Sequence, residues 1–129
     1  MACVAALLAA LSPYARPEEQ RGQEEQRGSV RLLVQSSLLA GFRFHAAGGL
    51  WLQLRVGDEL VLAREPGNPH DARAVRVEWR GHMLGYVPRR DNDALAWGMD
   101  NGEHLRARIS RLQPHRNPAK RIEFEVYLE

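Results

Sequence analysis

Apolar and polar residues alternate along much of the chain after residue 30, with the period of two that is typical of β-strands. The clearest case is the segment 74–79, where Val75, Val77 and Trp79 share one parity. Six segments show a strand-like pattern: 38–45, 59–65, 74–79, 82–87, 105–110 and 121–128. Short strands at this spacing are typical of small all-β domains. We therefore expect a mainly β fold, with six strands closed into a small barrel.

Turn signals separate these segments. Arg80-Gly81 predicts a two-residue hairpin, and Pro66-Gly67-Asn68-Pro69 is a dense cluster of turn-forming residues. Gly48-Gly49 interrupts the apolar pattern, and one helical turn is expected directly after it, over 50–54.

One short helix is predicted between two of the strands. It is capped by Asp91 or Asn92, reaches about Asp100 and ends at Asn101-Gly102. Three apolar residues are expected to turn toward the core: Leu95, Trp97 and Met99. This helix would plug or flank the barrel.

Residues 1–29 have a different composition from the rest. Ala2 to Leu11 is an apolar, alanine-rich run without the positive region that precedes the core of a signal peptide. The sequence Glu-Glu-Gln-Arg-Gly then occurs twice, at 18–22 and 24–28, as a polar low-complexity linker. We expect residues 1–29 to be an accessory segment and residues 30–129 to be the domain. The alternative for the apolar run is a signal sequence or a helix on a membrane surface.

The chain of 129 residues is long enough for one compact domain. Its single cysteine, Cys3, excludes an internal disulfide and a cysteine-rich zinc site. No apolar run approaches the roughly 20 residues that cross a bilayer, so we expect a cytoplasmic protein without a membrane span. The formal net charge is +2, which suits localised anion binding and not a polycation.

The basic residues are almost all of one kind. Lys120 is the only lysine, and the other 17 basic residues are arginines. Arginine forms bidentate hydrogen bonds with phosphate and stacks on aromatic rings, which lysine does less well. A compositional bias of the source genome explains this usage equally well.

Three segments carry the most specific signal: 40–45 (AGFRFH), 64–75 (REPGNPHDARAV) and 84–90 (LGYVPRR). The turn Glu-Pro-x-Asn-Pro-x-Asp followed by Ala-Val, with Leu-Gly-Tyr-Val-Pro after a hairpin, resembles the HIRAN domain family over about 32–129. The resemblance implies an OB-like β-barrel that binds single-stranded DNA at its 3′-hydroxyl end. It also implies a role in DNA repair or replication-fork processing, for a stand-alone bacterial member whose helicase or nuclease partner is a separate protein.

The first of these segments supplies a cation and two rings. If 38–45 is a strand, Arg43 and His45 share a face that can meet phosphate, and Phe44 points the other way. The family carries an Arg-aromatic-aromatic tripeptide that contacts the terminal nucleotides. Arg43 matches it, Phe44 keeps a stacking ring without a hydroxyl, and His45 departs from it. The alternative for Phe44 is plain core packing.

The second segment offers an amide, an imidazole and a carboxylate on one turn. Asn68 can pair with a base edge, His70 can stack where the family often has tyrosine, and Asp71 can accept a hydrogen bond from a 3′-hydroxyl. The alternative is structural, because Asn and Asp side chains commonly close turns by bonding to their own backbone.

The third segment adds Tyr86 and two cations. Tyr86 matches a position near the terminal nucleotide in the family, or else belongs to the barrel wall. Arg89 and Arg90 match a basic position that touches the DNA backbone. At a helix N-terminus they oppose the helix dipole, a cost that an anion bound there would explain. The alternative is a solvated pair of charges.

Catalysis has little support in the sequence. No G-x-x-x-x-G-K-[ST] loop is present, and the histidines are dispersed. We expect a nucleic-acid-binding module that is monomeric, needs no cofactor and is not an enzyme. Two alternatives remain open: an adaptor whose groove holds a peptide, and a weak metal-dependent hydrolase built from His70, Asp71 and Asp91.

Overall fold

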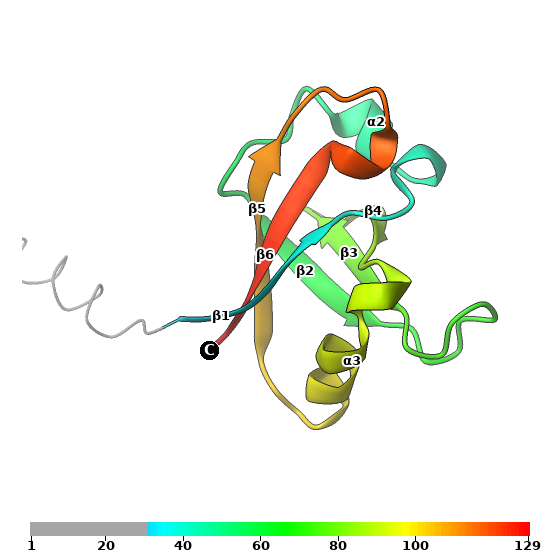
Figure 1. Ribbon diagram of the computed structural model, residues 1–129, viewed down its shortest axis with the longest axis vertical. Helices are drawn as coiled ribbons and strands as arrows, with labels where there is room; N and C mark the ends of the chain where they lie inside the picture. Colours follow the sequence, from blue (N-terminus) through cyan, green and yellow to red (C-terminus); the bar gives the residue numbers. More distant parts are fainter. Residues whose placement is uncertain (1–30) are drawn as a thin grey trace, which may run out of the picture. The chain divides into compact units, whose positions relative to one another are not determined.

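The computed structural model describes residues 31–129, so our expectation for 1–29 lies outside the described residues. Within 31–129 six antiparallel strands form one sheet in the order β1-β6-β5-β2-β3-β4 (Figure 1). Their bounds are β1 Leu32–Leu38, β2 Glu59–Arg64, β3 Val75–Trp79, β4 His82–Tyr86, β5 Leu105–Leu112 and β6 Ile122–Leu128. The mainly β class predicted from the alternation is confirmed.

The sheet is not closed into the expected barrel. Its edge strands, β1 and β4, share no ladder. In the described part of the chain they are joined at a single isolated bridge, between Ala40, just after β1, and Tyr86 at the end of β4. Two backbone hydrogen bonds of 2.9 Å each make this bridge. The arrangement is therefore an open, strongly curved sheet whose edges touch at one point.

Short helices cover the two ends of the sheet. In the region 31–129 they are η1 Phe42–Phe44, α2 Ala47–Leu50, η2 Arg89–Asp91, α3 Asp93–Asp100 and η3 Pro118–Lys120. Figure 1 shows α2 and α3 at opposite ends of the molecule. The predicted helix corresponds to α3, in which Leu95 is buried and Met99 packs partly against the core. The expectation for Trp97 was wrong, because its side chain is 65% exposed.

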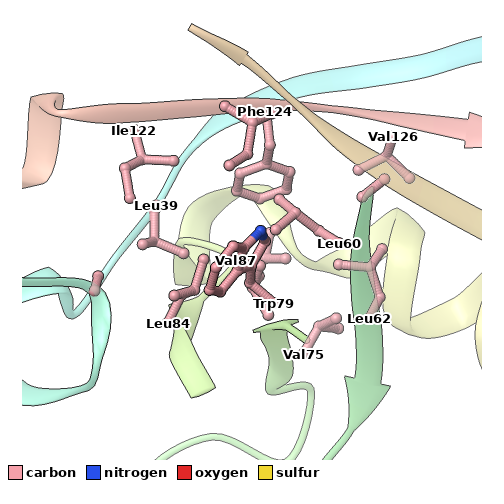
Figure 2. Close-up of a cluster of buried hydrophobic side chains, with 14 of the residues drawn as sticks. Leu39, Leu60, Leu62, Val75, Trp79, Leu84, Val87, Ile122, Phe124 and Val126 are labelled. Carbon is pink, nitrogen blue, oxygen red and sulfur yellow. The ribbon is translucent and has the colours of Figure 1, made fainter. Parts of the chain in front are cut away.

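The core lies between the two halves of the curved sheet, where the inward residues of β2, β3 and β4 meet those of β5 and β6 (Figure 2). Val75, Val77 and Trp79 are buried as their parity predicts. The hairpin at Arg80-Gly81 is also confirmed, and both residues have positive φ angles, of 45° and 81°. That pattern is the one required by a type I′ turn.

The first strand lies elsewhere than expected. It ends at Leu38, and residues 42–44 form a 3₁₀ turn instead of continuing the strand. Gly41 has a φ of 80°, a left-handed conformation that breaks the strand. The N-terminal residues of β1 are missing from the predicted pattern because Leu32, Leu33 and Val34 are all exposed on an edge strand. Residues 48–49, expected to be a break, lie inside α2.

A carboxylate network fixes the connection between β2 and β3. Glu65 Oε1 accepts hydrogen bonds from Asn68 Nδ2 at 3.1 Å and from the Tyr86 hydroxyl at 2.9 Å, and its Oε2 accepts one from Arg76 Nη1 at 3.0 Å. Burial raises the pKa of Glu65, but these three donors together outweigh it, so the pKa lies below its usual range. The ionised carboxylate thereby joins the connection to β3 and β4.

We predict that Gly85→Ala destabilises the domain by about 1–3 kcal/mol, as overpacking does elsewhere. A Cβ atom at Gly85 would lie 2.2 Å from the Ala40 carbonyl oxygen, so the bridge between the sheet edges has to move. Gly67→Ala is the matched control, since nothing lies within 4 Å of a Cβ atom there. Urea denaturation of both variants measures the difference, and equal midpoints would contradict the prediction.

We further predict that Glu65→Gln lowers the free energy of unfolding at pH 7 by roughly 1–2 kcal/mol, because a charged acceptor is lost. A carboxyl group whose folded pKa is depressed stabilises the fold above its unfolded pKa of about 4.3, and this contribution is lost as the pH falls toward the folded pKa. The gap between wild type and variant should therefore shrink below about pH 4.3.

Chemical denaturation from pH 7 down to pH 3 measures this gap. Glu59→Gln, at an exposed position of β2, is the control and should change little at any pH. A gap for Glu65→Gln that stays constant with pH would show that the ionised carboxylate is not what stabilises the connection.

Candidate functional site

A groove of about 670 Å³ opens where η1, the β2–β3 connection, β4 and η2 meet; we call it the main groove. Seven of the nine residues singled out from the sequence line it: Phe44, His45, Asn68, His70, Asp71, Tyr86 and Arg89. Ala40, Gly41, Ala74 and Val87 complete its mostly apolar wall. Segments that are far apart in the sequence are brought together here by the bridge between Ala40 and Tyr86.

Two aromatic side chains enter the groove from the η1 turn. Phe44 is 82% exposed, so the core-packing alternative is excluded, and the buried ring of the turn belongs to Phe42. The His45 ring stands edge-on to the Tyr86 ring, with centroids 5.6 Å apart and planes at 70°. The strand-face argument for this segment was wrong, because a 3₁₀ turn sends Phe44 and His45 to the same groove.

Arg43 and Arg90 do not line the groove. Arg43 is exposed on η1, between the buried Phe42 and the exposed Phe44. Arg90 lies in η2, where its Nε atom is 3.7 Å from a carboxylate oxygen of Asp91. Each is adjacent in the sequence to a residue that lines the groove, Phe44 or Arg89, but neither is part of the groove's wall.

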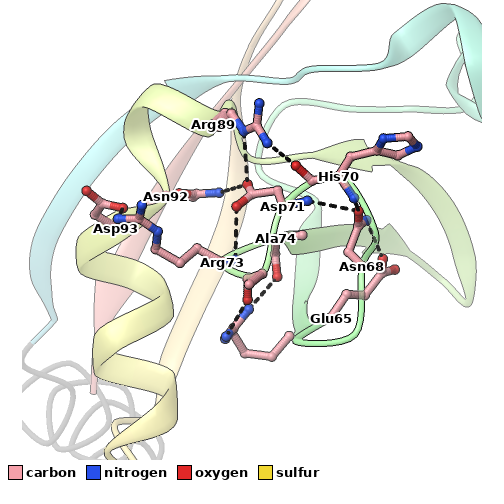
Figure 3. A network of polar contacts seen from close by, with 11 residues as sticks. Glu65, Asn68, His70, Asp71, Arg73, Ala74, Arg89, Asn92 and Asp93 are labelled. Carbon is pink, nitrogen blue, oxygen red and sulfur yellow. Dashed lines mark hydrogen bonds and ion pairs between the residues drawn. The ribbon is translucent and has the colours of Figure 1, made fainter.

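The Asn68 amide is engaged by its own loop. Its Oδ1 atom accepts hydrogen bonds from the backbone N–H of His70 at 2.9 Å and of Asp71 at 3.3 Å, and its Nδ2 atom donates to Glu65 (Figure 3). This is the structural alternative, in which Asn68 closes the turn. That Asn68 also reads a base edge stays a prediction.

Asp71 is held in place from three sides. Its carboxylate accepts hydrogen bonds from the Arg73 backbone N–H at 3.0 Å and from Asn92 Nδ2 at 2.7 Å, and Arg89 Nε lies 3.9 Å away (Figure 3). The backbone hydrogen bond from Arg73 is the main cause that lowers the pKa of Asp71, and Asn92 and Arg89 add to it against a smaller opposing effect of burial. Asp71 is therefore an oriented, ionised carboxylate at the groove.

Arg89 lies at the mouth of the groove. It belongs to the separate turn η2 and not to the first turn of α3, so the argument from the helix dipole does not apply to it. Its guanidinium donates to the His70 carbonyl oxygen and lies beside Asp71. The side chain is largely exposed, and a stronger anionic acceptor can compete for its donors.

Tyr86 contributes a ring to the wall and directs its hydroxyl away to Glu65. Burial raises the pKa of the Tyr86 hydroxyl, and the neighbouring Glu65 carboxylate raises it further. The hydroxyl is thus protonated and committed as a donor. Tyr86 is therefore a wall residue of the groove, and its place near a terminal nucleotide stays a prediction.

Two residues that shape the site were missed in the sequence. Glu65 belongs to the conspicuous turn motif, so its position was visible although its partners were not. Asn92 occupies the N-cap position of α3 as expected, but its side chain makes no capping bond: it is only 1% exposed and bonds to Asp71, 21 residues earlier. No local pattern reveals such a pair.

The groove combines flat rings, an exposed cation and a fixed anion within one concave surface. Among residues 31–129, no group of three or more His, Cys, Asp and Glu side chains is placed to hold a metal ion. None of the helices described is long and apolar enough to cross a membrane. Stacking, phosphate pairing and recognition of a hydroxyl are the chemistry that these side chains can provide.

Known structures share this fold. A protein from Lactobacillus plantarum is 27% identical, with a TM-score of 0.67 over 77% of this chain and 95% of that chain. The HIRAN domain of human HLTF is 22% identical, with a TM-score of 0.59 over 76% of this chain and 78% of that chain, a likeness that shows the fold alone. No curated protein matches the chain.

The family comparison agrees with the motifs that line the groove. The family model described as the HIRAN domain matches residues 32–129, which include every described strand and helix. The segments 40–45, 64–75 and 84–90, which suggested the resemblance, all lie within this match. The chain therefore belongs to the HIRAN domain family.

Proposed function

We propose that this protein binds single-stranded DNA and that the main groove captures the 3′-hydroxyl end of the strand. Membership of the HIRAN domain family supports a nucleic-acid-binding module. The observation that carries the finer proposal is the placement of an exposed ring, Phe44, in the same groove as the ionised Asp71 and the cation of Arg89. These are the three kinds of group that a strand end requires.

The rings bind bases. A phenyl ring that is largely exposed beside an apolar wall offers a stacking platform, and one stacked base contributes about 1–3 kcal/mol. His45 and Tyr86, packed edge-on, form the wall next to it. Stacking on Phe44 is tolerant of sequence because every base presents a flat face.

The cation binds phosphate. Arg89 donates to a neutral carbonyl oxygen of His70, and a phosphate oxygen is a stronger acceptor for the same donors. Binding therefore exchanges one hydrogen bond of the free protein for a charge-assisted one. Arg43, exposed on the η1 turn, is available to the backbone of the same strand just outside the groove.

The anion selects the strand end. The side chain of Asp71 is 19% exposed and its carboxylate is held by Asn92, so it is oriented before any ligand arrives. A carboxylate repels an internal phosphate but accepts a hydrogen bond from a free hydroxyl. Asp71 thereby favours a 3′-hydroxyl over a strand that continues or carries a terminal phosphate.

In the cell such a module would act in DNA repair or at replication forks, beside a helicase or nuclease supplied as a separate protein. A peptide adaptor that uses the same groove would lack the steep salt dependence that phosphate contacts impose. A hydrolase built from His70, Asp71 and Asp91 would need a ligand cluster, and residues 31–129 contain none. That the protein is not an enzyme stays a prediction.

We predict that an oligonucleotide with a 3′-hydroxyl binds at least about ten-fold more tightly than the same strand with a 3′-phosphate, as expected for a lost charge-assisted hydrogen bond with added repulsion. Asp71→Asn should shrink this ratio, because the repulsion disappears while the shape is kept. Fluorescence anisotropy with 3′-phosphate, 5′-phosphate and unmodified strands measures it.

The 5′-phosphate strand is the control, since it adds the same charge at the other end and should bind like the unmodified strand. Equal affinity for all the strands would mean that the groove binds single strands wherever they lie along the chain of nucleotides. The proposal that it selects a 3′-hydroxyl end would then be wrong.

We also predict that Phe44→Ala weakens binding of the unmodified strand by about five-fold or more, the lower limit for one stacked base. The same change should leave the thermal midpoint nearly unchanged, because the exposed ring packs against little of the protein. Leu52→Ala, at an exposed apolar residue that does not line the groove, is the control for both measurements. Unchanged affinity in Phe44→Ala would show that no base stacks on Phe44.

A further inference from the structure

A second groove lies on the other side of the η1 turn; we call it the lateral groove. It has a volume of about 510 Å³ and lies between η1, α2 and the β5–β6 connection. The residues that matter for its chemistry are Phe42, Gly48, Trp51, His115, Arg116 and Arg121. Figure 1 shows the β5–β6 connection passing α2 at the same end of the molecule.

An aromatic pair forms one wall of this groove. The rings of Phe42 and Trp51 pack edge to face, with centroids 5.8 Å apart and planes at 74°. The guanidinium carbon of Arg121 lies 5.0 Å from the centroid of the Phe42 ring, and its Nε atom donates to the His115 carbonyl oxygen at 2.8 Å. A cation is thus held beside aromatic rings before any ligand binds.

The charge of the lateral groove is of one sign. Its lining contains the guanidinium groups of Arg116 and Arg121, and no described lining residue is acidic. Arg116 is exposed, so its donors face solvent. A ligand that fits carries negative charge and a flat ring, and a nucleotide within a single strand combines the two.

The two grooves are joined by the η1 turn itself. Phe44 lines the main groove and Phe42 lines the lateral groove, two residues apart on one 3₁₀ turn. Arg43 is exposed between them and lines neither. A strand that leaves the main groove in this direction passes the Arg43 cation and then reaches the partly exposed Trp51 ring, since Phe42 itself is buried under Arg121.

We propose that the lateral groove is a second subsite, which binds a nucleotide on the 5′ side of the strand whose 3′ end occupies the main groove. This inference rests on the proposed function and adds a direction and a minimum length to it. The affinity of the protein should then rise with strand length until the lateral groove is filled, beyond the gain due to phosphate charge alone.

The experiment compares a trinucleotide, which we expect to fill the main groove first, with a ten-nucleotide strand, by anisotropy competition on the whole chain. Gly48→Leu blocks the lateral groove, because a Cβ atom at Gly48 lies at an ordinary contact distance of 3.8 Å from Phe42 Cε1 and the larger side chain extends from there. Gly49→Leu is the matched control, since nothing lies within 4 Å of a Cβ atom at Gly49.

We expect Gly48→Leu to reduce the affinity for the ten-nucleotide strand by about five-fold or more, the loss of one stacked base, and to leave the trinucleotide unaffected. Arg116→Gln should reduce the gain in affinity between the trinucleotide and the ten-nucleotide strand, and the salt dependence of that gain. Arg111→Gln, at an exposed arginine of β5 that lines neither groove, should do neither. Circular dichroism melting verifies that all four variants fold.

The outcomes separate the two proposals. If wild type binds neither strand, the proposed function fails. If wild type binds both strands while folded Gly48→Leu and Arg116→Gln keep the full gain with length, the main groove stands and the lateral subsite is overturned. A loss that is equal in Gly48→Leu and Gly49→Leu overturns it as well.

Discussion

The site depends on the bridge that ties one edge of the sheet to the other, between Ala40 and Tyr86. The backbones come this close because Gly85 has no side chain where the Ala40 carbonyl oxygen approaches. The chain enters η1 directly after the bridge, so that Phe44 and His45 from one edge line the same groove as Tyr86 from the other. With the edges apart, the main groove would have only one wall.

Polar residues with obvious chemistry serve mostly to hold the groove in shape. Glu65 anchors Asn68 and Tyr86, and Asn92 orients Asp71, so these five polar side chains form two hydrogen-bonded groups around the groove. Hydrogen bonds to an ionised acceptor are stronger than neutral ones, and a site that is ordered in advance loses less entropy on binding. The groups left to meet a ligand are the exposed ones, above all the Phe44 ring and the Arg89 guanidinium.

The η1 turn divides the surface into two grooves with related chemistry. Each presents aromatic rings with an arginine beside them, but only the main groove contains a carboxylate among its described lining residues. A carboxylate suits a strand end, where a hydroxyl replaces a phosphate. It is unfavourable along a strand, where every nucleotide carries a phosphate. The two grooves are therefore chemically suited to different positions on one strand.

Local patterns in the sequence determined strands β2 to β6, the hairpin at Arg80-Gly81 and helix α3, because alternation and turn residues act over a few residues. The motifs around 64–75 and 84–90 were also sufficient to suggest the family. Tertiary structure decided the rest. The start of β1 has no alternation because it is an exposed edge, and the bridge that closes the groove joins Ala40 to Tyr86, from segments far apart in the sequence. The pairing of Asn92 with Asp71 likewise joins residues whose separation along the chain leaves no periodic signal, so only the folded chain brings the site together.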